Sequence, residues 1–268
     1  MHLHGAVVAI TGAGSGIGRA LALACQSRGA RVSICDLDEV GLAETQSLLG
    51  AGIHAQVVDV SDRVQMRAYA AAVAELFGVV NVIINNAGVT YSGPITDVEY
   101  DDFEWLMGIN FWGVVYGTKE FLPYLIESGN GHIVNLSSLF GLVSVPTQAA
   151  YNSAKFAVRG FTESVRQDLI VAGLPVAVTC VHPGGVKTGI ARNGRSTQGQ
   201  DHQANSRRFE EDLARLTPDQ AAQIIVKAIE RDKPRVLVGI DAHILHNLAK
   251  FIGARYQGLY AKVVSRSN

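Results

Sequence analysis

The sequence predicts an α/β fold in which a doubly wound, parallel sheet of mostly seven strands carries helices on both faces. Three observations predict it. Short apolar runs alternate seven times with longer stretches of helical periodicity. The runs are continuously apolar, as residues 7–10 are, which is typical of strands buried on both faces. The intervening helical stretches are longer than ten residues, as crossovers between parallel strands require.

The expected elements follow one another along the whole chain without a linker. The strands are expected at residues 6–10, 31–35, 54–58, 80–85, 132–137, 176–181 and 235–239. The helices are expected at about 17–28, 38–49, 62–77, 100–126, 150–172, 218–231 and 243–264. We therefore expect one domain over residues 1–268. A polar, Gly/Ser/Gln/Asn-rich stretch at about 189–210 is expected to be its lid, because long loops in compact domains are usually functional or disordered.

Composition excludes several classes of protein. A chain of 268 residues with 48% hydrophobic and 18% charged residues is globular, and its net charge of -1 gives no reason to expect nucleic acid. Its three cysteines lie far apart, which predicts buried, reduced thiols, and its eight histidines lack ligand spacing, so we expect no metal. The N-terminus does not resemble a signal peptide, and no apolar run reaches the roughly 18 residues of a membrane span, so the expected location is the cytoplasm.

A glycine-rich turn, TGAGSGIG at residues 11–18, follows the first predicted strand and opens the first predicted helix. Glycines let a phosphate approach the backbone closely, and the helix N-terminus offers free N–H groups to it. The spacing is G-x-x-x-G-x-G, from Gly12, Gly16 and Gly18, and differs from G-x-G-x-x-G. A tight turn alone would also use glycines, but the position between strand and helix favours a dinucleotide site.

Asp36 ends the second predicted strand. A carboxylate there accepts hydrogen bonds from the adenosine ribose and repels a 2′-phosphate, so we expect NAD(H) to be preferred over NADP(H). Neither Ser15 nor Leu37 supplies a basic residue, and Arg19 can be an ordinary solvated side chain of the helix. The alternative for Asp36 is a helix N-cap, but Asp38 suits that position better, which leaves Asp36 for the ribose.

Polar residues suited to catalysis cluster at predicted strand ends. Tyr151 and Lys155 stand at i and i+4, so on a helix they share a face. Ser138 follows the fifth predicted strand. Ligands of open α/β sheets bind at the carboxyl ends of strands, where residues 85–88 and Pro183 also fall. No G-x-S-x-G pattern is present, so Ser138 is interpreted as a hydrogen-bond donor and not as a nucleophile.

From about residue 5 to 240 the chain resembles the short-chain dehydrogenase/reductase family. The shared motifs are TGAGSGIG at 11–18, Asp59-Val60, NNAG at 85–88, Asn110, Ser138, Y-x-x-x-K at 151–155, and Pro183-Gly184 with Val186 and Thr188. The resemblance implies a Rossmann-type fold, a hydride transfer between NAD(H) and a secondary alcohol or ketone, and a homodimer or homotetramer.

The resemblance also implies a role for each matching residue. Tyr151 would be the general acid/base, Ser138 would hold the substrate oxygen, and Lys155 would bind the nicotinamide ribose. Asn110 would hold a water in a proton relay; the alternative is that it polarises a helix bend. Asp59 and Val60 would flank adenine, and Thr188 would contact the carboxamide. The expected cofactor-binding residues are Gly12, Ser15, Gly16, Ile17, Gly18, Asp36, Leu37, Asp59, Val60, Asn86, Ala87, Gly88, Tyr151, Lys155, Pro183, Gly184, Val186 and Thr188.

Lys155 is expected to lower the pKa of Tyr151. An unperturbed tyrosine has a pKa of about 10, and a useful base titrates near 7. Closing that gap needs roughly 4 kcal/mol. One cation at about 4 Å in an effective dielectric near 20 supplies about that much.

The segments expected beside the nicotinamide are apolar, and we expect a neutral, medium-sized apolar alcohol or ketone as substrate. Each of their side chains can equally well pack in the core. Arg192 and Arg195 are the lid cations that can approach a charged substrate. The apolar side chains are Leu139, Phe140, Val145, Val186 and Ile190.

Other functions remain open from the sequence. The chain can be a catalytically silent NAD-binding scaffold, or an epimerase or dehydratase of the same fold. The helix at about 243–264 is amphipathic and basic, which is compatible with a peripheral membrane contact. Packing of that helix on the body or on a second subunit is favoured over the membrane. The long helix at 150–172 is the expected symmetric interface.

Overall fold

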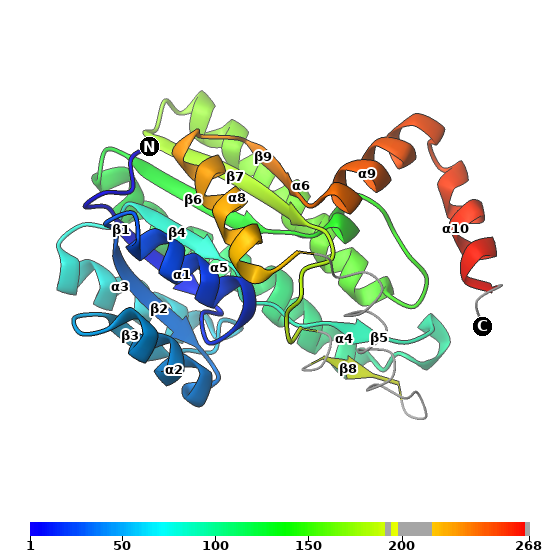
Figure 1. Cartoon of the computed structure of the whole chain (residues 1–268), viewed down its shortest axis with the longest axis horizontal. Coiled ribbons are helices and arrows are strands. Elements are labelled where there is room, and N and C mark those ends of the chain that lie inside the picture. Colours follow the sequence, from blue (N-terminus) through cyan, green and yellow to red (C-terminus); the bar gives the residue numbers. More distant parts are fainter. Residues whose placement is uncertain (191–193, 198–215, 266–268) are drawn as a thin grey trace.

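The computed structural model describes residues 1–190, 194–197 and 216–265, with side chains to residue 262 (Figure 1). Its centre is a seven-stranded, all-parallel sheet in the order β3-β2-β1-β4-β6-β7-β9. This confirms the predicted doubly wound α/β fold. The first and last residues of each strand lie within two residues of the predicted ones. The strands are β1 Val7–Thr11, β2 Arg31–Asp36, β3 His54–Val57, β4 Val82–Asn85, β6 Gly131–Leu136, β7 Val176–Pro183 and β9 Arg235–Val238.

Helices connect the strands, and local sequence signals begin several of them. Asp38 and Asp62 accept hydrogen bonds from the first-turn amides of α2 and α3, and Thr217 and Gln220 form a capping box on α8. Asp38 thus takes the N-cap position expected for it. The helices are α1 Gly16–Gln26, α2 Glu39–Leu49, α3 Arg63–Phe77, α4 Tyr100–Met107, α5 Gly113–Glu127, α6 Ala149–Val171, α8 Pro218–Glu230, α9 Ile240–Ile252 and α10 Arg255–Ser265.

The sheet is buried on both faces, which explains why its strands are continuously apolar. Along β1, Val8 and Ile10 point into one hydrophobic core, and Val7 and Ala9 point into the other. The first core is closed by α1 and α8, which lie in front of the sheet in Figure 1. The second is closed by α3, α5 and α6 behind it. All three cysteines are buried, as expected.

Two of the predicted helices are interrupted. The helix expected at 100–126 contains a π-helical turn, Gly108–Trp112, between α4 and α5. The helix expected at 243–264 is two helices, because Gly253 adopts a φ of 60° that ends α9. Glycine takes this left-handed conformation without the steric cost that other residues have. In the described part of the chain, no helix is both long and apolar enough to cross a bilayer.

A small second sheet joins the expected lid to the segment after β4. β8, Arg195–Ser196, pairs in parallel with β5, Tyr91–Ser92, and neither strand was predicted. The rest of the lid, residues 191–193 and 198–210, lies outside the described residues. The carboxyl ends of β1, β4, β6 and β7 meet at one edge of the main sheet. The order of the strands reverses between β1 and β4, which is where ligands of such sheets bind.

Candidate active site

The structure brings the predicted catalytic residues together at this edge. Tyr151 and Lys155 lie on the first turns of α6, and the Lys155 ammonium is 5.6 Å from the centre of the Tyr151 ring. Ser138 follows β6 and shares a hydrogen bond with the Tyr151 hydroxyl. A Cβ placed on Gly88 would lie 3.2 Å from Asn110 Oδ1 and 3.4 Å from Lys155 Nζ, so these two polar groups converge on Gly88.

Lys155 is buried almost completely, with 3% of its surface exposed. Its ammonium donates a hydrogen bond to the Leu136 carbonyl at 3.1 Å. Burial lowers the pKa of Lys155 to about 8. An ammonium has three donors, so Lys155 can hold a ligand hydroxyl while it keeps its bond to β6.

The pKa of Tyr151 differs from the expectation. Burial raises this pKa above the usual value of a tyrosine, and the hydrogen bond with Ser138 offsets part of the rise. The expected lowering by Lys155 is therefore wrong for the protein by itself. The physical reason is that desolvation penalises the charged tyrosinate more than its neighbours stabilise it.

Asn110 lies at the centre of the π-helical turn and is fully buried. Its side chain accepts a hydrogen bond from Val89 N–H and donates one to the Val89 carbonyl, both at 2.8 Å. Asn110 thus fixes the segment after β4 against the interrupted helix, which agrees with the structural alternative considered for it. The π-helical turn widens the helix locally and is a feature often found at functional sites.

Ser138 is positioned from two sides. Its hydroxyl oxygen accepts a hydrogen bond from Phe140 N–H at 3.1 Å, and its carbonyl lies 2.9 Å from His182 Nδ1. His182 is fully buried, and burial lowers its pKa to about 4, so it is neutral at pH 7. A neutral imidazole carries one N–H, and the carbonyl partner places it on Nδ1. The Phe140 ring meets Tyr151 edge-on, with centroids 6.2 Å apart.

The glycine turn has the features that a pyrophosphate requires. Ser15, the N-cap of α1, is exposed and its side chain caps no backbone amide, and no acidic residue stands in the first turn. Gly16 has a φ of 53° and faces Thr188, from which a Cβ would lie only 3.2 Å away. The first turn of α1 therefore offers N–H groups and positive dipole to an anion. These residues fit a dinucleotide cofactor.

The end of β4 is bonded to the same turn. Asn86 Nδ2 donates to the carbonyls of Thr11 and Gly12, each at 2.9 Å, and Ala87 N–H donates to the Thr11 hydroxyl at 3.1 Å. A Cβ on Gly18 would collide with the Gly12 carbonyl oxygen, which explains why this position is a glycine. Asn86 and Ala87 thus hold the end of β4 against the glycine turn.

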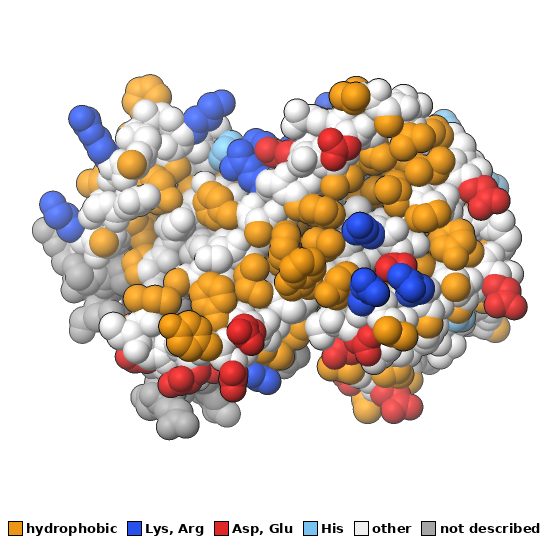
Figure 2. Space-filling view, turned by 180° about the vertical axis from the view of Figure 1, so that it is seen from behind, with side chains coloured by type: hydrophobic (Ala, Val, Ile, Leu, Met, Phe, Trp, Pro, Cys, Tyr) orange, Lys and Arg blue, Asp and Glu red, His pale blue; other side chains and the backbone are white. Residues whose placement is uncertain are grey.

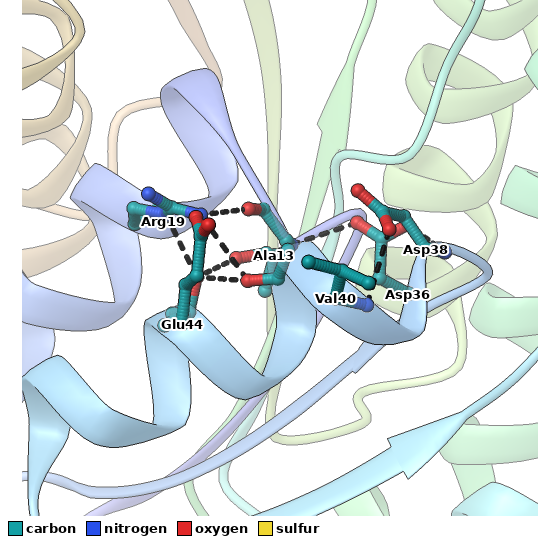
Figure 3. A network of polar contacts seen from close by, with 9 residues as sticks. Ala13, Arg19, Asp36, Asp38, Val40 and Glu44 are labelled. Carbon is teal, nitrogen blue, oxygen red and sulfur yellow. Dashed lines mark hydrogen bonds and ion pairs between the residues drawn. The ribbon is translucent and has the colours of Figure 1, made fainter.

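As expected, Asp36 is not the N-cap of α2, and its carboxylate is held by the glycine turn. Its Oδ2 accepts a hydrogen bond from Gly14 N–H at 2.7 Å, and its Oδ1 accepts one from Asp38 N–H at 3.0 Å (Figure 3). These two bonds orient the carboxylate at the end of β2. A carboxylate has about four acceptor sites, so two bonds leave capacity for ribose hydroxyls.

The sequence suggested that Arg19 can be an ordinary solvated side chain, but the structure shows it bonded to several neighbours. Its guanidinium pairs with Glu44 at 2.8 Å, donates to the Thr45 hydroxyl at 2.8 Å and contacts the carbonyls of Gly14 and Gly41 (Figure 3). It therefore locks the glycine turn onto α2. Glu44, Thr45 and Gly41 belong to α2, so no local pattern around Arg19 predicts this network.

The expected adenine-flanking residues lie at the end of β3. Asp59 Oδ1 accepts hydrogen bonds from Ser61 N–H at 2.8 Å and from the Ser61 hydroxyl at 2.6 Å. Val60 is buried against Gly113, at which a Cβ would come within 2.9 Å of it. Leu37, the residue after β2, is 64% exposed.

Asp241, at the start of α9, supports the segment that follows β7 and was not singled out in the sequence. Its Oδ2 accepts a hydrogen bond from Gly185 N–H at 2.7 Å. A Cβ on either Gly184 or Gly239 would collide with its carboxylate. Asp241 thus fits between two glycines and fixes the turn between Pro183 and Thr188. A lone aspartate in a helical pattern looks like a surface residue, which is why the sequence did not reveal it.

Replacing Asp241 by alanine is expected to raise the Kd for NADH about tenfold, because hydrogen bonds to charged groups contribute about 1.5–3 kcal/mol. NADH fluorescence titration measures this. The matched control is Asp219→Ala, which removes an exposed aspartate from the first turn of α8 and should leave the Kd unchanged. Equal affinity in the two variants would contradict the role of Asp241.

The expected substrate residues divide into two groups. Leu139 and Val186 pack in hydrophobic cores, with 4% of each exposed, which agrees with the alternative that they are core residues. Phe140, Val145 and Ile190 are half-buried.

The described lid cation, Arg195, is engaged elsewhere. It pairs with Asp102 at 2.8 Å, and its guanidinium lies 3.9 Å from the centre of the Trp105 ring. Arg192 lies outside the described residues.

Comparisons with known proteins agree with this architecture. Residues 6–199 match the short chain dehydrogenase family model. The putative oxidoreductase SadH of Mycobacterium tuberculosis is 49% identical over 265 residues, covering 98% of this chain and 96% of that protein. The solved structure of a short chain dehydrogenase/reductase from Burkholderia phymatum in complex with NAD has a TM-score of 0.88 and 32% identity, covering 96% of this chain and 97% of that one. The 3-ketoacyl-(acyl-carrier-protein) reductase of Brucella melitensis, solved with NADH, has a TM-score of 0.77 and 26% identity, covering 89% and 97%.

Proposed function

Because the chain belongs to the short-chain dehydrogenase/reductase family of oxidoreductases, we propose that it transfers a hydride between NAD(H) and a secondary alcohol or ketone. The observation that supports this most strongly is the convergence of Ser138, Tyr151 and Lys155 beside the glycine turn. NAD(H), when bound, supplies or accepts the hydride.

The proton is handled by the protein. In reduction, the Tyr151 hydroxyl donates its proton to the carbonyl oxygen of the substrate, and in oxidation the tyrosinate takes it back. Burial raises the pKa of Tyr151, so the hydroxyl is protonated at pH 7 and is ready for reduction. Ser138 donates a hydrogen bond that holds the substrate oxygen beside Tyr151. Lys155 binds the ribose, and its positive charge favours the tyrosinate in oxidation.

The proposed preference for NAD(H) over NADP(H) has three supports. Asp36 places a carboxylate at the end of β2, where a 2′-phosphate would be repelled. Arg19, whose guanidinium contacts the glycine turn, is already paired with Glu44 and bonded to Thr45. The two solved relatives named above hold NAD and NADH.

The proposed substrate is a neutral, medium-sized apolar alcohol or ketone. The half-buried Phe140 stands next to Tyr151, and Arg195 is committed to Asp102. We expect kcat/KM for neutral secondary alcohols to exceed that for matched hydroxy acids at least tenfold, measured from NADH absorbance. Arg195→Ala should leave this ratio unchanged. A preference for the charged series would show that a lid cation sets specificity.

The same assay decides between this proposal and its alternatives. A silent NAD-binding scaffold would bind NADH and show no turnover with any alcohol or ketone. An epimerase or dehydratase would convert substrate without a net change in NADH. The converging hydroxyl, phenol and ammonium groups favour the dehydrogenase, because a scaffold needs none of them.

We also propose a homodimer or homotetramer through α6 and the π-helical turn before α5. Trp112 and Phe156 are 48% and 37% exposed, and hydrophobic side chains gather in the middle of the face seen in Figure 2. Exposed apolar patches of this kind mark protein interfaces. Light scattering should give two or four times the chain mass of 28.6 kDa, and a monomer would contradict the proposal. The cytoplasmic location stays a prediction.

A further inference from the structure

The helices α9 and α10 extend away from the body of the protein (Figure 1). One side of α9 packs through Ala242, Leu245 and Ala249 into the hydrophobic cluster that contains Leu139 and Val143. The opposite side faces solvent and is strongly apolar. Its exposed hydrophobic residues follow helical spacing and form one stripe, which consists of Ile240 (78% exposed), Ile244 (60%), Leu248 (48%) and Phe251 (90%).

Cations border this stripe. Lys250 lies along the edge of the exposed face of α9, and Arg255 and Lys262 share one face of α10 with the exposed Leu259. Figure 2 shows Lys and Arg side chains beside hydrophobic ones on the lobe at its left edge, where these helices lie. A helix with an apolar stripe and flanking cations is the pattern of helices that lie in the interface of a membrane.

The sequence of α9 and α10 contains a single acidic residue, Asp241. Its carboxylate points inward and accepts a hydrogen bond from Gly185 N–H. The exposed charged side chains of α9 and α10 are therefore cationic, although the whole chain has a net charge of -1. A twofold contact between two such surfaces would bring Lys250 and Arg255 near their own copies, and the described residues of α9 and α10 offer no exposed acid to pair with them. Charge complementarity thus favours an anionic partner over a second copy of the chain.

We propose that α9 and α10 form a docking surface for the anionic face of a lipid bilayer. The stripe from Ile240 to Phe251 enters the boundary between headgroups and acyl chains, while Lys250 and Arg255 meet the lipid phosphates. The helices do not span the bilayer. Docking and the proposed hydride transfer are separate properties, because the stripe and these cations are not among the residues proposed to bind the cofactor or the substrate.

Docking would place the candidate active site next to the bilayer. The Tyr256 hydroxyl of α10 accepts a hydrogen bond from Ser144 N–H at 2.9 Å, in the loop between Ser138 and Tyr151. At the other end, Asp241 joins α9 to the turn after β7. The two helices are thus bonded to both loops that border the site. A bilayer on their outer face would supply apolar substrates at the local concentration of the lipid phase.

The test is flotation of the full-length protein with vesicles of phosphatidylserine and phosphatidylcholine, and with vesicles of phosphatidylcholine alone. We expect binding to the anionic vesicles that weakens with salt. Each surface cation contributes about 1 kcal/mol near an anionic membrane, so Lys250→Glu with Arg255→Glu should weaken binding by more than about 25-fold. Phe251→Ser should weaken it about tenfold or more.

Matched controls separate this surface from general charge and hydrophobicity. Lys227→Glu with Arg231→Glu changes two exposed cations at the end of α8, and Val171→Ser changes an 89% exposed apolar residue of α6. These variants should bind as the wild type does. NADH titration of every variant checks that the fold is intact.

Three results would overturn the proposal. They are the absence of vesicle binding, equal loss in control and test variants, and a vesicle-free oligomer that Phe251→Ser dissociates. The last of these would assign the stripe to a second copy of the chain. A protein that binds vesicles without turnover would overturn only the proposed hydride transfer, and one that turns over without binding would overturn only the docking.

Discussion

Replacing Tyr151 by phenylalanine is expected to lower kcat by about 10²- to 10⁴-fold, the usual contribution of a general acid or base. The substitution removes only the hydroxyl oxygen, and with it the proton that the proposed reaction moves. The ring remains in place against Phe140, so the fold and the Kd for NADH should change little. Steady-state kinetics with a neutral ketone and NADH titration measure the two quantities separately.

The control for this variant is Tyr100→Phe, which removes a hydroxyl from a residue that is 86% exposed at the start of α4. It should keep the wild-type kcat. If Tyr151→Phe retained more than a tenth of the wild-type kcat, the proton would have to come from another group, and the assignment of Tyr151 would fail.

The strands and most helices could be predicted because their signals are local. An apolar run of five residues or an aspartate before a helix acts at its own position. The break of the helix at 100–126 has a different origin, since it centres on Asn110, whose buried amide bonds to Val89. No local pattern in residues 100–126 encodes that distant partner. The break at Gly253 had a local signal, but a glycine within an amphipathic pattern is compatible with a continuous helix.

The sequence predicted which residues form the site better than it predicted their pKa values and their partners. Tyr151, Lys155 and Ser138 meet as their spacing implied, but the predicted direction of the Tyr151 pKa shift was wrong. A pKa depends on how deeply a group is buried, and a motif does not give that depth. Arg19 and Asp241 were missed for a related reason, because their partners lie on other elements of the fold.

Exchanging Asp36 for alanine together with Leu37 for arginine is expected to shift the cofactor preference toward NADP(H) about 10²-fold or more. The exchange removes the carboxylate that repels a 2′-phosphate and adds a cation at a position that is 64% exposed, where its side chain has room to extend. A charge-assisted hydrogen bond to phosphate contributes about 1.5–3 kcal/mol, and relief of the repulsion adds to it. The ratio of kcat/KM for NADPH to that for NADH measures the shift.

The exchange has one structural cost that a second variant can isolate. Asp36 also accepts a hydrogen bond from Gly14 N–H, so its loss should weaken the glycine turn and lower kcat/KM with both cofactors. Asp36→Asn keeps an acceptor for Gly14 and removes the charge, so it should relax the preference with less loss of activity. Leu48→Arg, on an exposed position of α2, controls for the added charge and should leave the preference unchanged. A wild-type enzyme that is already faster with NADPH than with NADH at equal concentration would contradict the role of Asp36, because its carboxylate would then fail to exclude the phosphate.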